Sequence, residues 1–112
     1  MEKILIIDNK EVPFKSTGAF FLKYKAQFKK DGISELIKVS ECIEKIGKSN
    51  TVDLDSDVLY NLIWTLAKTA NPKIKPPMQW FDEFETFPII EVVIELQDLL
   101  MSTIQSSVKA KN

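Results

Sequence analysis

The chain has 112 residues, of which 45% are hydrophobic and 28% charged, and its formal net charge is −1. This composition is typical of a folded globular protein, because aromatic and long aliphatic side chains can offset the entropy lost on folding, and it excludes wholesale disorder. No apolar run approaches the ~20 residues that span a bilayer, and the N-terminus lacks the pattern of a signal peptide. We therefore expect one cytoplasmic domain over residues 1–112.

Several residue types that enzymes need are missing or rare. The chain has no histidine, no arginine, one cysteine and three glycines. The commonest proton shuttle and metal ligand is therefore absent, and a disulfide framework, a cysteine-rich zinc site and a glycine-rich phosphate loop are excluded. We expect no catalytic residue, no metal site and no cofactor, and a role in binding or assembly rather than an enzyme.

The N-terminal segment predicts a β-hairpin over about residues 3–16. An apolar, β-branched run at 3–7 is followed by Asp8-Asn9, residue types that tolerate a tight turn. Val12 and Phe14 alternate onto one face of the second strand, and Pro13, which has no N–H group, favours an edge position. We interpret the edge at residues 11–16, with Val12 and Phe14, as a surface for self-association by strand addition.

Helical spacing of apolar residues continues from about residue 18 to residue 105. The rings of Phe20, Tyr24 and Phe28 are spaced by four residues and predict a first helix with one aromatic stripe. A second helix is expected from Ile33 to Ile46, capped by Asp31 and ended by Gly47. A polar linker follows at 48–52. The most buried helix should come next, begin at a group of aspartates and end at Asn71-Pro72; its core stripe is Leu59, Leu62, Ile63, Leu66 and Ala67.

The C-terminal half predicts a short aromatic helix at 78–84 and a last helix from Ile89 to about Ser106, with Pro88 in its first turn. The tail at 106–112 is polar and is expected to fray. The sequence thus predicts a mainly α fold, a small bundle of four to five helices with an N-terminal β-hairpin.

Two groups of acidic residues could suggest chemistry. Asp53, Asp55 and Asp57 have the spacing of the start of a calcium loop, but the glycine and the closing glutamate of such a loop are absent, so helix capping is the better interpretation. Paired carboxylates between residues 82 and 98 lie at helical spacing, and nothing in the sequence marks one of them as buried. We expect them on solvated faces.

The basic segment Lys15–Lys30 gives an alternative function. Its lysines alternate with aromatic residues, as in platforms that stack single-stranded nucleic acid. The overall charge of −1 and the lack of arginine argue against this, so a small nucleic-acid-binding regulator that uses Lys15–Lys30 is kept as the alternative hypothesis. Charge is also uneven: residues 1–52 hold ten lysines and seven acids, and residues 53–100 hold three lysines and nine acids. Such asymmetry favours head-to-tail self-association or a basic partner.

Aromatic residues are crowded between Trp80 and Phe87, and a short helix cannot point all of them to one side. Large rigid rings are favoured anchors of protein interfaces. We predict a partner-binding surface made by Trp80, Phe81 and Phe84, with the apolar side of the 89–104 helix behind them.

The order of several segments resembles the small tail assembly chaperones of long-tailed bacteriophages and prophages of Gram-positive bacteria. The similar segments are IDNKEVPFKSTGA (7–19), YKAQF (24–28), YNLIWTLAKTANP (60–72), WFDEF (80–84), FPIIEV (87–92) and ELQDLL (95–100). They follow one another in the family's order over nearly the whole chain. The family has no catalytic motif, so the resemblance assigns no site residue.

The resemblance implies a non-catalytic, mainly helical protein in the cytoplasm of the bacterial host, absent from the mature virion. Such chaperones bind the tape measure protein and keep it soluble while the tail tube polymerises around it, and they tend to form homo-oligomers. Many have a longer form, made by a programmed frameshift, that recruits the tail-tube protein. Ala110-Lys111-Asn112 could be encoded by a slippery GCA-AAA-AAC, which would permit such a shift; AAG at Lys111 would exclude it.

Overall fold

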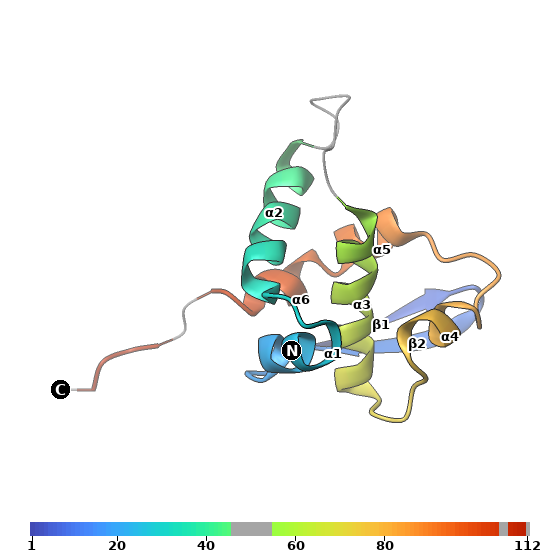
Figure 1. Ribbon diagram of the computed structural model, residues 1–112, viewed down its shortest axis with the longest axis horizontal. Helices are drawn as coiled ribbons and strands as arrows, with labels where there is room; N and C mark the ends of the chain where they lie inside the picture. Colours follow the sequence, from blue (N-terminus) through green and yellow to red (C-terminus); the bar gives the residue numbers. More distant parts are fainter. Residues whose placement is uncertain (46–54, 106–107, 112) are drawn as a thin grey trace.

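The computed structural model describes residues 1–45, 55–105 and 108–111, and within them two strands are followed by six helices (Figure 1). The predicted hairpin is present. Strand β1 (Glu2–Ile7) pairs antiparallel with β2 (Lys10–Lys15), in the register Ile7↔Lys10 to Glu2↔Lys15. Asp8 and Asn9 form the two-residue turn with φ of 54° and 62°, left-handed values that asparagine and aspartate tolerate better than most residues.

One face of the hairpin packs on the helices. Val12 is 6% exposed and Phe14 is fully buried, because both side chains point from β2 toward helix α3 (Ser56–Ala70). The side chains of Val12 and Phe14 are therefore part of the core and are not free to meet a second copy, so the predicted strand addition could use only the backbone edge of β2.

Helices α1 (Phe20–Phe28) and α2 (Gly32–Lys45) pack against each other and against α3. The predicted ring stripe faces inward, with Phe20 and Tyr24 buried and Phe28 half-buried. Asp31 caps α2 as predicted, its Oδ1 accepting from the Ile33 N–H at 3.1 Å. Gly32 permits the close approach of the two helices, since a Cβ there would lie 2.9 Å from Cδ1 of Phe21.

Helix α3 is the centre of the fold, as predicted, and the whole predicted core stripe is buried. Asp55 caps it, with Oδ1 accepting from the Asp57 N–H at 3.0 Å, which is the expected role of an aspartate at this end. Asn71 ends it, its N–H donating to the Ala67 carbonyl. Asp53, the linker at 48–52 and the expected helix end at Gly47 lie outside the described residues.

The predicted last helix is divided in two. Helix α4 (Pro77–Phe81) is followed by α5 (Ile89–Glu95) and α6 (Gln97–Ser102), with Pro88 preceding the first turn of α5 and Leu96 at the break, where φ is −100° and ψ is 11°. The Glu95 carbonyl, which a continuous helix would pair with the Leu99 N–H, accepts instead from Lys3 Nζ at 2.8 Å. The Leu99 N–H donates to Asp98 Oδ1 at 2.9 Å.

Both partners of that missing helical bond are therefore satisfied elsewhere, which stabilises the break. Along α5, Val92 and Val93 are in the core, whereas Ile90 and Ile94 are 48% and 44% exposed.

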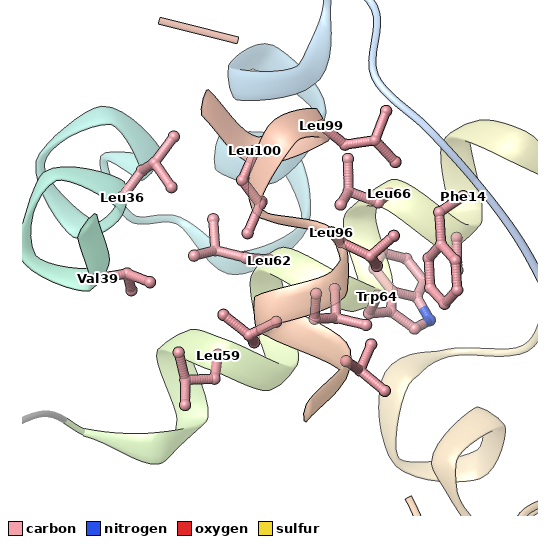
Figure 2. Packing of buried hydrophobic residues seen from close by; sticks show 14 of the residues in the cluster. Phe14, Leu36, Val39, Leu59, Leu62, Trp64, Leu66, Leu96, Leu99 and Leu100 are labelled. Atoms are coloured by element: carbon pink, nitrogen blue, oxygen red, sulfur yellow. The ribbon is translucent and has the colours of Figure 1, made fainter. Parts of the chain in front are cut away.

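Every strand and helix contributes to one cluster of buried side chains. In Figure 2, Leu36 and Val39 of α2 point toward Leu62 of α3 and Leu100 of α6. The Trp64 ring is buried as well, and its Nε1 donates to the Lys75 carbonyl at 3.0 Å, so the polar atom of this core ring is paired. The structure confirms a mainly α fold with a small N-terminal hairpin, but with six described helices rather than four to five.

Candidate functional site

The aromatic residues of 80–87 form a compact cluster at one end of the fold. Successive rings meet edge to face: Trp80 lies 5.2 Å from Phe84, Phe84 lies 5.1 Å from Phe87, and Phe81 lies 4.9 Å from Phe87, between ring centroids. Such pairs stabilise by about 0.5–1.5 kcal/mol beyond the area that they bury. The ring contacts therefore help to stabilise this part of the fold.

This geometry changes the predicted partner-binding surface. Trp80 is 5% exposed and belongs to the core, so its ring is not available to a partner in this structure. Phe84 is half-buried and is covered from the hairpin by Lys10, whose Nζ lies 5.0 Å from the ring centroid. Of the three predicted residues, Phe81 lines a surface hollow.

That hollow is a groove between α3 and α4, with a volume of about 440 Å³. Its floor is the pair of Tyr60 and Phe81, which meet edge to face at 5.0 Å between ring centroids. Met78 stands on its rim and is 78% exposed. We call it the α3–α4 groove; the residues that line it are Lys30, Asp57, Tyr60, Asn61, Pro77, Met78, Phe81 and Asp82.

Local sequence explains why the groove is open. Pro76-Pro77 fixes the start of α4, so Met78 falls in the first turn of a five-residue helix. Tyr60 follows Leu59 of the core stripe and therefore lies at the border of the buried side of α3. Sequence reasoning missed Tyr60, Pro77 and Met78, because a helical pattern tells which side is buried but not which neighbouring helix stops short of covering the border.

The chemistry of the groove is that of binding. Its walls are aromatic and thioether groups, and the charges on its rim are one lysine and two aspartates. In residues 1–45, 55–105 and 108–111, no three carboxylate or thiol side chains come close enough together to hold a metal ion. An apolar side chain from a partner would find ring edges and a flexible methionine there, which is the lining typical of grooves that accept helices.

A second hollow lies beside the start of α1 and the end of α6, with a volume of about 480 Å³. Hydroxyl groups line much of it, but the Oγ atoms of Ser16 and Ser102 bond to each other at 3.0 Å. The edge-to-face pair of Phe20 and Phe21 also lines this hollow, but four of its nine lining residues carry hydroxyl groups, so it is more polar than the α3–α4 groove and is the weaker candidate.

The structure also places the basic segment Lys15–Lys30. Its lysines are exposed, but the rings between them are turned toward the core, Phe20 being 1% exposed and Tyr24 fully buried. An exposed row of rings for base stacking is therefore not formed, and the nucleic-acid alternative loses the feature that suggested it.

No known protein family, curated protein or solved structure matches this chain. Separately, no helix in the described part of the chain is both long and apolar enough to cross a membrane.

Proposed function

We propose that the protein is a phage tail assembly chaperone that binds the tape measure protein, keeps it soluble and helps tail-tube polymerisation without catalysing a reaction. Two independent features support this. The first is the ordered resemblance of six sequence segments to that family. The second is the α3–α4 groove, an open apolar surface on a chain that lacks histidine, arginine and a phosphate loop.

The observation that carries the proposal is the exposure of Met78 above the ring pair of Tyr60 and Phe81. An unbranched thioether can adapt to different apolar side chains, and the rings below it provide a rigid floor. A long helical client presents apolar side chains at i, i+3 and i+4, and a groove of this kind accepts such a row. The chaperone would bind this segment and shield it from water.

The test uses two apolar residues of similar exposure, one at the groove and one outside it. Met78 (78% exposed) lies in the first turn of α4 at the groove, and Leu22 (74% exposed) lies in the first turn of α1 outside it. A glutamate in a first turn is compatible with the helix, so Met78→Glu and Leu22→Glu should both fold.

Each tagged variant is co-expressed with the tape measure protein of the same phage, and the client recovered in the soluble, tag-bound fraction is measured. We expect Met78→Glu to weaken client binding by about tenfold or more, since burial of a methionine side chain contributes about 1.5–3 kcal/mol. Leu22→Glu should bind as the unchanged chain does. Equal binding by all three chains would contradict the groove, and failure of the unchanged chain to retain the client would contradict the function.

Expression from the native gene with its downstream DNA tests the proposal independently. We expect mass spectrometry to find, besides the 112-residue product, a minor product extended beyond Asn112 in a shifted frame, which we propose recruits the tail-tube protein. We further propose that the chaperone stays in the host cytoplasm, so peptides of this chain should be missing from purified virions; their presence at structural copy number would contradict a chaperone.

A further inference from the structure

Strand β1 is apolar on both of its faces. In the run Ile4–Ile7, Leu5 and Ile7 lie on the face that packs on the helices, and Ile4 and Ile6 lie on the opposite face. Continuous apolar runs are typical of strands that are covered on both sides. Yet Ile4 is 57% and Ile6 is 73% exposed, and no described element covers them. The strand therefore has the composition of a doubly covered strand, with one cover missing.

The register defines the residues of this outer face. Ile4 lies opposite Pro13, Ile6 opposite Glu11, and Glu2 opposite Lys15. These six side chains alternate away from the helices, and they give an apolar centre with one cation and two anions around it. We call them the outer face of the hairpin.

We propose that the outer face is an interface between two copies of this chain, with the two hairpins stacked face to face. The charges make the face complementary to itself. If the two-fold axis runs along the strands, Lys15 lies opposite Glu2 of the partner subunit; if it runs across them, Lys15 lies opposite Glu11 of the partner subunit. In both arrangements Ile4 and Pro13 stack on apolar side chains of the partner subunit and the lysine meets a carboxylate, while Ile6 lies opposite the other glutamate.

Stacking is favoured over joining the strands edge to edge. Next to a two-residue turn, paired residues alternate between hydrogen-bonded and non-hydrogen-bonded, which puts Pro13 in a non-hydrogen-bonded pair. Its missing N–H is therefore on the free edge of β2, which cannot offer a complete row of donors. Stacking of the outer faces uses side chains and needs no such row.

The size of the face sets the expected strength. It offers three apolar side chains per copy, and together they cover less area than the ~800 Å² that each partner buries in a standard stable interface. We therefore expect a weak, rapidly exchanging dimer with a dissociation constant of roughly 10 μM to 1 mM.

The experiment is sedimentation over a concentration series up to about 1 mM, on chains whose fold is checked by circular dichroism. The unchanged chain should shift from monomer to dimer. Ile4→Lys, Lys15→Glu and the double variant Glu2→Lys/Glu11→Lys should each remain monomeric, whereas Leu22→Lys, at an exposed site on α1, should dimerise normally.

Mixing gives the decisive result. Lys15→Glu leaves an all-acidic rim and Glu2→Lys/Glu11→Lys an all-basic one, so an equimolar mixture should regain a heterodimer. A monomeric unchanged chain at the highest concentration would overturn the proposal, as would a dimer that persists in Ile4→Lys or a mixture that stays monomeric. Because Met78 lies on α4 and not on the hairpin, failure of this interface and failure of client binding are separately detectable.

Discussion

At the scale of single residues, Tyr24 gives the clearest link between burial and chemistry. Tyr24 lies on α1, which packs against α3, and its ring is fully buried. Its hydroxyl donates to the carboxylate of Glu35 on α2. Burial, together with the hydrogen bond to Glu35 and the charge of that carboxylate, raises the pKa of Tyr24 far above its usual range. Asn61 of α3 opposes this by donating to the tyrosine oxygen. The group thus connects three helices.

The raised pKa predicts how stability changes at alkaline pH. The folded pKa lies above the unfolded value of about 10, so the stabilisation is complete below pH ~10 and is lost as the pH rises further, because the unfolded chain then gives up its proton more readily. In Tyr24→Phe this part of the alkaline loss should vanish, while the free energy of unfolding at neutral pH falls by about 1–2 kcal/mol.

Urea titrations between neutral pH and about pH 11 measure both effects. Tyr60→Phe is the matched control, because it removes a half-buried tyrosine hydroxyl from α3 and leaves Tyr24 in place. Parallel alkaline curves for the unchanged chain and Tyr24→Phe would contradict the prediction.

At the scale of elements, the division of the last helix depends on a contact from the far end of the chain. Lys3 Nζ binds the Glu95 carbonyl at 2.8 Å and lies 3.5 Å from Asp98 Oδ2. The ion pair by itself is weak, because its side chains are 37% and 52% exposed. The carbonyl bond matters more, since it occupies the acceptor that a continuous helix would use.

Lys3→Met should therefore destabilise the fold by about 0.5–1.5 kcal/mol in urea. Lys75→Met is the control: Lys75 pairs with Glu83 at 3.6 Å but is more exposed than Lys3, and we expect it to cost less than about 0.5 kcal/mol. In Lys3→Met/Asp98→Ala, carbon chemical shifts at residues 95–99 should become helical as the Leu99 N–H returns to the Glu95 carbonyl. A break that persists in the double variant would show that packing, not these bonds, divides the helix.

At the scale of the whole molecule, one buried cluster reaches every strand and helix, with α3 at its centre. We expect one cooperative unfolding transition, in which circular dichroism and the fluorescence of the two buried tryptophans give the same midpoint. Separate midpoints would indicate that the C-terminal helices unfold on their own.

Leu66→Ala tests the energetic weight of the core. Leu66 is fully buried on α3, so the substitution should lower the free energy of unfolding by about 2–5 kcal/mol through lost burial and the cavity left behind. Leu22→Ala, made at a site that is 74% exposed, should change it by less than about 0.5 kcal/mol. Similar values for the two variants would contradict the assignment of α3 as the central helix.

The secondary structure was largely predictable, because its signals are local. Turn residues at 8–9, capping aspartates at 31 and 55 and the spacing of Leu59, Leu62 and Leu66 each act within a few residues along the chain, and the structure confirms them. The site was predictable only in part. The crowding of rings named Phe81, which lines the α3–α4 groove, but also Trp80, which is core, since neighbours far away in the sequence decide which ring of a cluster is covered.

The sequence by itself determined the hairpin, the central helix and the shortage of catalytic residue types, since these follow from composition and from periods of two and 3.6 residues. Only the tertiary structure decided that the last helix breaks at Leu96, that Val12 and Phe14 face inward, and that Tyr60 and Met78 border an open groove. Each of these depends on contacts between segments distant in the chain, such as Lys3 with Glu95, and local patterns carry no information about which distant segments will meet.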